Sequence, residues 1–229
     1  MKLACASGAF SRAIERGDLT QIEFVEMCAR ELACDGIVLD VAHFPRIDGD
    51  YLAQIKKMAA DLGLDIAAVL DDAFFSADEA AMRSSIDLTL ALGSPLLAGP
   101  LGGEAAGPWS SQRERLARAT SLAKIANVTL ALRNAPGTFA ATTADLKRVA
   151  KEADSAWLRF GPEPAQFDAT SDARAIVDNI VLLWSHASAL PGTVRDAFPE
   201  FRGYLALDDP SGTAQLAEMK TRLRAWRVS

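Results

Sequence analysis

The sequence alternates between short apolar runs and longer stretches of helical periodicity, and it does so about eight times. Short, continuous apolar runs are typical of strands buried on both faces of a sheet. The stretches between them repeat apolar residues at three- and four-residue spacing, as amphipathic helices do. The apolar runs, each predicted to be a strand, are residues 3–6, 36–41, 66–70, 95–101, 128–132, 156–160, 180–184 and 204–207.

Helix start and stop signals separate these runs. Capping-box spacing, a Ser or Thr followed three residues later by Glu, predicts helix starts at Thr20, Ser76 and Ser111. Gly63 and Gly93 predict two helix ends. Later helices are predicted over about residues 143–153, 171–179, 194–198 and 213–226. Each predicted strand is therefore followed by a helix.

Strand–helix repeats with short connections predict a parallel α/β fold. The main alternative is a doubly wound open sheet, which usually has fewer strands and a Gly-rich phosphate turn after the first. Here the first run is followed by SGAFSRAIERGD, which contains no G-x-G-x-x-G. The 229 residues suit one small (β/α)8 barrel with little room for insertions. We therefore predict a single TIM-barrel domain over residues 1–229.

Charge and cysteine content exclude several classes of function. The net charge is −6, and the densest basic stretch, residues 220–227, interleaves with an apolar stripe, which is typical of a solvated helix face. The three cysteines lack metal-site spacing, which favours reduced, buried thiols. No signal peptide or membrane span is predicted. We expect a soluble cytoplasmic protein that binds neither nucleic acid nor membrane.

The polar residues that follow the apolar runs are the candidate site. In a (β/α)8 barrel the active site lies at the carboxyl ends of the strands. Polar residues at those positions are Asp40, His43, Asp71, Asp72, Glu104, Arg133, Asn134, Glu163, Gln166, His186, Asp208 and Asp209. For Asp71 and Asp72, a solvated loop is the more common explanation than paired acid–base carboxylates.

Four segments carry a family resemblance. CDGIVLDVAHFP resembles the pattern GxDGxEL…HFP, VTLALRNAPG resembles VxLALENHPG, LRFGPEPAQFDA resembles LxxxxDPGHFDA, and GYLALDD resembles GxxxxE. Each is weak alone, but together they occur in the right order and on the right predicted strands. The chain thus resembles, over nearly its whole length, the xylose-isomerase-like barrels, which include sugar isomerases, epimerases and family-2 AP endonucleases.

The resemblance implies a divalent metal at the barrel mouth, and this sequence departs from that pattern. The family's ligands are a Glu, an Asp, often a His, and a second Glu, which suit Mn²⁺-, Mg²⁺- or Co²⁺-type ions. The corresponding positions here are Val38, Arg133, Ala135, Glu163, Gln166 and Asp208. His186 is the residue that keeps a family role.

The Arg at position 133 argues against a bound divalent metal. A guanidinium stays protonated and offers no lone pair, so it repels a dication. We therefore predict no metal and no cofactor. Two roles remain open for Arg133: an ion pair with Glu163 or Asp208 that fills the vacated site, or direct bidentate contact with a ligand.

These features predict a sugar isomerase/epimerase-like barrel that acts on or binds a small polyhydroxylated substrate. The catalytic candidates are Glu163, His186 and Asp208, and the substrate-binding candidates are His43, Arg133, Asn134, Gln166 and Asp72. The alternative is a non-catalytic pseudoenzyme in which Arg133 holds an anionic or sugar-like ligand. AP endonuclease activity is disfavoured by two histidines and a net charge of −6. For His43 and His186 a purely structural role stays open, and the sequence predicts no oligomeric state.

Overall fold

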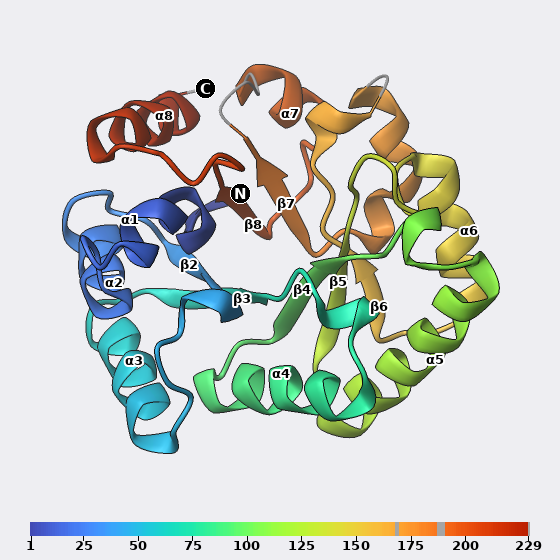
Figure 1. Cartoon of the computed structure of the whole chain (residues 1–229). Coiled ribbons are helices and arrows are strands. Elements are labelled where there is room, and N and C mark those ends of the chain that lie inside the picture. Colours follow the sequence, from blue (N-terminus) through green and yellow to red (C-terminus); the bar gives the residue numbers. More distant parts are fainter. Residues whose placement is uncertain (168–169, 187–190, 229) are drawn as a thin grey trace.

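A computed structural model describes residues 1–167, 170–186 and 191–228. Figure 1 shows strands at the centre and helices around them. The strands are β1 (Lys2–Ala6), β2 (Gly36–Asp40), β3 (Asp65–Leu70), β4 (Leu96–Pro100), β5 (Thr129–Arg133), β6 (Leu158–Phe160), β7 (Leu182–Ser185) and β8 (Tyr204–Leu207). They pair in parallel in the order β6-β5-β4-β3-β2-β1-β8-β7.

A bridge between Phe160 and Ile180 joins the two ends of this sheet. Two further backbone bonds cross the same seam, from Val181 N to Phe160 O at 2.9 Å and from Trp184 N to Pro162 O at 2.9 Å. The fold is therefore the predicted (β/α)8 TIM barrel, with its weakest seam between β6 and β7.

The helices form the outer ring. They are α1 (Ser11–Glu15), α2 (Gln21–Arg30), α3 (Gly49–Asp61), α4 (Glu79–Leu92), α5 (Trp109–Ala126), α6 (Thr143–Ala153), α7 (Pro191–Ala197) and α8 (Leu216–Val228). Short 3-10 helices follow several strands: η1 (Ser7–Phe10), η2 (Val41–His43), η3 (Phe74–Ser76), η4 (Glu104–Ala106), η5 (Pro164–Gln166) and η6 (Thr170–Asn179). No helix in the described ranges is both long and apolar enough to span a membrane.

One of the three predicted capping boxes is confirmed. Thr20 accepts a hydrogen bond from Glu23 N, and the Glu23 side chain accepts one from the Thr20 backbone N–H. The prediction at Ser76 was wrong, because Asp78 caps α4 instead. The prediction at Ser111 was also wrong, because α5 already begins at Trp109. The N-cap residues are Asp78 for α4 and Pro108 for α5.

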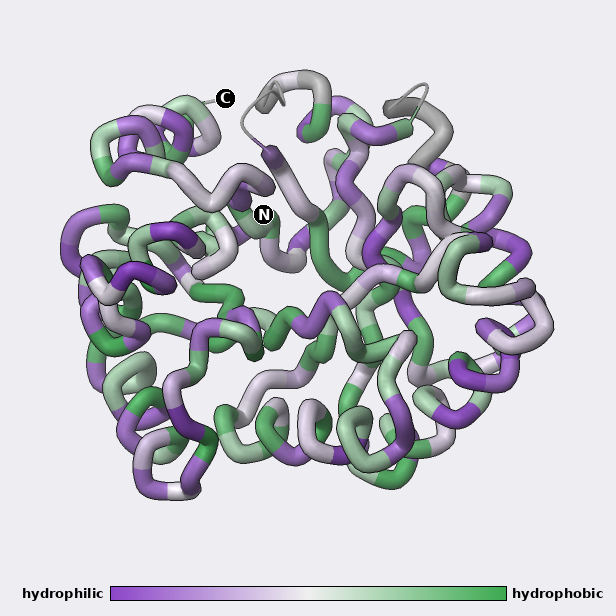
Figure 2. Tube along the Cα trace, in the orientation of Figure 1, coloured by the Kyte–Doolittle hydropathy of each residue, from purple (hydrophilic) through white to green (hydrophobic). Residues whose placement is uncertain are grey.

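The barrel has two apolar regions. The larger lies between the sheet and the helices, and it includes the three cysteines, which are buried and free as predicted. The smaller fills the barrel interior, where alanines from several strands surround Trp184. Figure 2 shows apolar residues along the central strands and polar ones on the outside of the helices. Trp184 is the largest side chain of this inner cluster, and Arg133 lies over its ring.

Gly99 in β4 gives a first prediction. A Cβ at this position would lie 2.4 Å from the backbone oxygen of Asp71. Gly99→Ala must therefore displace the loop after β3, and we expect it to lower the free energy of unfolding by about 1–3 kcal/mol in urea titrations. Gly49→Ala is the matched control, since a Cβ there meets nothing within 4 Å. Equal stability of the two variants would contradict this close contact.

Candidate active site at the barrel mouth

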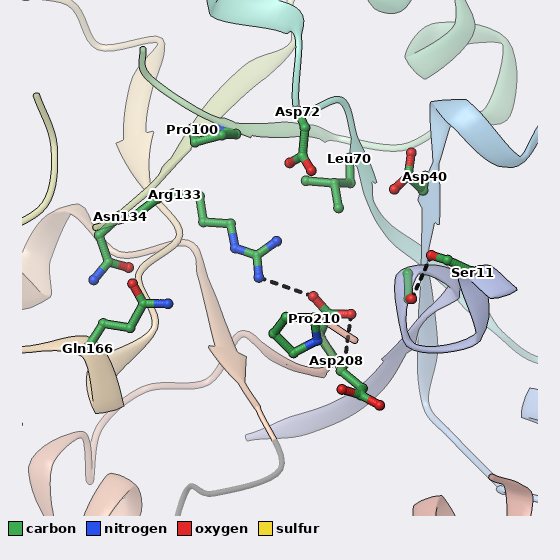
Figure 3. Close-up of a pocket in the computed structure, with 13 residues that line it drawn as sticks. Ser11, Asp40, Leu70, Asp72, Pro100, Arg133, Asn134, Gln166, Asp208 and Pro210 are labelled. Carbon is green, nitrogen blue, oxygen red and sulfur yellow. Dashed lines mark hydrogen bonds and ion pairs between the residues drawn. The ribbon is translucent and has the colours of Figure 1, made fainter. Parts of the chain in front are cut away.

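A cavity of about 290 Å³ opens at the carboxyl ends of the strands (Figure 3). Residues from the ends of β2, β3, β4, β5 and β8 and from η1 and η5 contribute to its wall. Its lining residues are Gly8, Ser11, Asp40, Leu70, Asp72, Pro100, Arg133, Asn134, Ala135, Gln166, Asp208, Asp209 and Pro210. The mouth cavity therefore lies where a (β/α)8 barrel places its active site.

Arg133, the last residue of β5, is the cation of this cavity. Its Nη2 lies 3.1 Å from Asp208 Oδ2 and 2.8 Å from His186 Nε2. Its Cζ lies 4.2 Å from the centroid of the Trp184 ring, a cation–π distance. The Arg133 side chain is 12 % exposed and that of Asp208 is 5 % exposed. The guanidinium is thus held on three sides by the protein, and Figure 3 shows it pointing toward Asp208.

Glu163, which follows β6, holds the His186 ring in its orientation. Its Oε2 lies 2.6 Å from His186 Nδ1 and accepts a bond from Gln166 Nε2 at 2.7 Å. Its Oε1 accepts from the His186 backbone N–H at 3.1 Å. Asn134 ties the backbone of Glu163 to β5, since its Oδ1 accepts from Glu163 N at 2.7 Å. The ends of β5, β6 and β7 are thereby joined by side chains.

The contacts of His186 favour one tautomer of its neutral ring. In that tautomer Nδ1–H donates to Glu163, and Nε2 accepts from Arg133. Burial lowers the pKa of His186, but the carboxylates of Asp208 and Glu163 outweigh it, so the pKa is raised. Burial likewise opposes ionisation of Asp208, but His186 and Arg133 hold its pKa below the ordinary value. Asp208 is therefore ionised at neutral pH.

Asp40 and Asp72 line the opposite part of the cavity. Burial raises the pKa of the Asp40 carboxyl, although the hydrogen bond from Ala42 N and the nearby His43 partly offset it. Burial also raises the pKa of Asp72, although Arg133 partly offsets the effect. Figure 3 shows both carboxylates pointing into the space that Arg133 faces. Both are placed to exchange protons with a bound molecule.

The residues of the mouth do not fit a divalent metal. A metal beside His186 would use its Nε2 lone pair, which in the neutral ring accepts from Arg133. Arg133 Nη2 also occupies the Asp208 oxygen. Within the described ranges, no group of three or more His, Cys, Asp or Glu side chains is arranged to hold a metal ion. Arg133 supplies the positive charge at the mouth and forms an ion pair with Asp208. An ion pair of this kind is the first of the two roles that the sequence left open for Arg133.

The structure brings together most of the predicted site residues. Arg133, Asn134, Gln166, Asp72 and Asp208 line the mouth cavity. His186 contacts Arg133, and Glu163 contacts His186, but neither Glu163 nor His186 lines the cavity. The roles proposed for these residues stay predictions.

His43 does not line the mouth cavity. Its Nδ1 lies 2.9 Å from Ser7 Oγ, and it lines a second cavity outside the barrel. Asp40 and Asp209 do line the mouth, although the sequence assigned neither a catalytic nor a substrate-binding role. The signal that marks them is their position directly after the second and eighth apolar runs. Trp109 packs against Phe139 as an anchor of α5, away from the mouth.

Comparisons with known proteins agree with this geometry. The family profile described as "Xylose isomerase-like TIM barrel" matches residues 24–185. No curated protein sequence matches the chain.

Several solved structures share the fold at low sequence identity. A D-psicose 3-epimerase from Clostridium cellulolyticum H10 aligns with a TM-score of 0.81 and 14 % identity, covering 100 % of this chain and 99 % of the epimerase. The probable 3-DHS dehydratase AsbF from Bacillus anthracis gives 0.78 and 13 %, with 99 % of each chain covered. The 3-keto-D-glucoside 4-epimerase YcjR from E. coli gives 0.76 and 12 %, with 100 % of each covered. By its profile match, the chain belongs to the xylose isomerase-like TIM barrel family.

Proposed function

We propose that this barrel binds a small, neutral, polyhydroxylated molecule in the mouth cavity without a divalent metal. The observation that carries the proposal is the contact of Arg133 Nη2 with both His186 and Asp208. A fixed guanidinium supplies the positive charge there and donates hydrogen bonds to hydroxyl or carbonyl oxygens. Several solved structures with this fold are sugar epimerases, which supports a sugar-like ligand.

The charge of the cavity lining favours a neutral ligand over an anionic one. Asp40, Asp72, Asp208 and Asp209 line the cavity, and Arg133 is the one cationic side chain among the described lining residues. Because Arg133 is already paired with Asp208, an anion would meet uncompensated negative charge. Hydroxyl groups, in contrast, donate hydrogen bonds to carboxylates. Of the two ligand types that the sequence suggested for a pseudoenzyme, the sugar-like one is therefore favoured.

Proton transfer, if the barrel isomerises its ligand, falls to the carboxylates that face the cavity. Asp40 and Asp72 have raised pKa values, which bring them closer to the range useful for acid–base catalysis. Glu163 is bonded to Gln166 and His186 and acts on the site by orienting His186. A cytoplasmic location and the absence of a nucleic-acid partner stay predictions from the sequence.

A thermal-shift screen tests the proposal. We expect D-fructose, D-psicose or myo-inositol at tens of millimolar to raise the melting temperature by a few degrees, by linkage. The shift should be the same with EDTA and with Mn²⁺, because Arg133 replaces the ion. NMR of the sugar after overnight incubation then separates an enzyme, which yields an epimer or isomer, from a non-catalytic binder.

Two outcomes would contradict the proposal. The first is a sugar-induced shift that appears only with Mn²⁺, together with about one bound ion per chain. The second is stabilisation by sugar acids such as gluconate but not by the matching neutral sugars. That result would show that the carboxylates of the cavity do not exclude anionic ligands.

A further inference from the structure

His43 lines a second cavity, which we call the α1–α2 groove. It is formed by α1, the start of α2, η2 and the start of α3, and it encloses about 520 Å³. Its lining residues are Ile14, Glu15, Gly17, Leu19, Thr20, Gln21, Ile22, Ala42, His43, Phe44, Pro45 and Tyr51. The groove shares no lining residue with the mouth cavity. An inference about it therefore does not rest on the proposed function.

Gln21 in this groove carries a buried amide whose polar atoms are unpaired in the described part of the chain. The residue is 2 % exposed, and neither Oε1 nor Nε2 has a hydrogen-bond partner among the described residues. A buried polar group left unpaired typically costs about 1–3 kcal/mol. Most buried side-chain polar groups are paired with the protein or with ordered water, so the Gln21 amide needs a donor and an acceptor that the described residues do not supply.

His43 adds a second polar group to the groove, and it is 7 % exposed. Ser7 Oγ accepts from Asp40 N at 3.0 Å and lies 2.9 Å from His43 Nδ1. Ser7 Oγ accepts from Asp40 N and still carries its hydroxyl hydrogen, and we assign that hydrogen to a bond with His43 Nδ1. This assignment from the hydrogen-bond network puts the proton of the neutral ring on Nε2. Nε2 makes no hydrogen bond with the described residues, so it can donate to a ligand.

We propose that the α1–α2 groove binds a small apolar molecule that ends in a neutral carboxamide. The apolar part packs on Ile14, Leu19 and Phe44. The carboxamide oxygen accepts from His43 Nε2–H, and the carboxamide and the Gln21 amide supply each other's missing donor and acceptor once Gln21 turns toward it.

A neutral end group fits better than a carboxylate for two reasons. A carboxylate has no hydrogen to donate, so it would leave Gln21 Oε1 unpaired. It would also approach Glu15, the one acidic residue among the described residues that line the groove. Three probes that share one ring but carry a carboxamide, a carboxylate or a methyl group therefore distinguish the contribution of hydrogen bonding from that of apolar contact.

Benzamide, benzoate and toluene are suitable probes for an NMR titration of the ¹⁵N-labelled chain. We expect benzamide to bind with a dissociation constant in the millimolar range, as suits a fragment of this size. Benzoate and toluene should bind about 10-fold more weakly. The backbone signals that move should belong to residues 14–22 and 42–51.

Gln21→Leu is the decisive variant. It should abolish the preference for benzamide over toluene while leaving toluene binding intact, because the apolar wall is unchanged. Gln54→Leu, the same exchange at an exposed position of α3, should retain the preference. Should Gln21→Leu fail to fold by circular dichroism, Ala42→Phe at the exposed rim serves instead, since it fills the groove and should weaken all three probes.

Three results would overturn the inference. One is equal affinity for benzamide and toluene. Another is a Gln21→Leu variant that folds and still prefers benzamide. The third is a set of shifted signals at the mouth rather than at the groove, which would place the amide beside Arg133.

Discussion

Replacing Arg133 with Met is expected to lower the free energy of unfolding by about 3–5 kcal/mol, because it leaves the buried Asp208 carboxylate without its guanidinium partner. Asp208 is 5 % exposed at its side chain and Glu163 is 2 % exposed. The pKa of Asp208 is kept low by His186 and Arg133 against the effect of burial. Without the guanidinium, His186 is the remaining one of these two partners that stabilises the ionised Asp208 carboxylate. Equilibrium urea unfolding of both proteins at pH 7 measures the difference.

The pH dependence of this loss has a defined sign. A carboxyl group whose pKa is lowered in the folded state stabilises the fold above its unfolded pKa, and this stabilisation is lost as pH falls through the folded pKa. Arg133→Met removes part of the stabilisation. The two proteins should therefore differ most near neutral pH, and the difference should shrink as pH falls through the ordinary pKa of Asp, about 4, toward the lowered pKa of Asp208.

Arg148→Met is the matched control for this experiment. Arg148 also lies over a tryptophan, Trp109, at 4.9 Å and pairs with Asp145 at 3.3 Å, but its side chain is 43 % exposed. An exposed pair of this kind is worth about 0–1 kcal/mol. Asp208→Asn in the Arg133→Met background should restore part of the lost stability, because it removes the unpaired charge. If both Arg→Met variants lose the same small amount, the mouth ion pair is not a buried one.

The fold could be predicted because the strand–helix pattern is local. Each strand is a continuous apolar run, since both of its faces are covered, and the run ends where the chain reaches the mouth. That is why Arg133, at the end of β5, and Asp208, just after β8, were placed together from sequence. The boundaries shifted by one or two residues, as at β7, which spans Leu182–Ser185 rather than residues 180–184.

The orientation of side chains in the loops could not be predicted. His43 follows β2 as a site residue would, yet η2 carries it to the outer side, where Ser7 holds it. Ser7 comes from β1–η1, and nothing in its local sequence marks that pairing. The bond between Glu163 and His186 likewise joins two loops after neighbouring strands. Such contacts depend on the spatial placement of loops, which periodicity does not encode.

Arg133→Glu is expected to create a divalent metal site in the mouth. The exchange removes the donor that now occupies His186 Nε2 and Asp208 Oδ2 and adds a carboxylate at the end of β5. His186 Nδ1 would still donate to Glu163, which leaves Nε2 as the ligand nitrogen, a tautomer common among metal-binding histidines. Calorimetry with Mn²⁺ should show about one ion per chain, bound at least about 100-fold more tightly than by the natural protein.

The comparison with Arg133→Met isolates the role of the added carboxylate. Both variants remove the guanidinium and free Nε2 of His186, but only Arg133→Glu offers a third anionic or neutral donor beside His186 and Asp208. Mn²⁺ should therefore raise the melting temperature of Arg133→Glu, since the ion relieves the repulsion between the introduced carboxylate and Asp208. Equal Mn²⁺ affinity in both variants would mean that β5 does not present this position to the metal. A gain confined to Arg133→Glu would support the view that Arg133 is the main barrier to metal binding in this mouth.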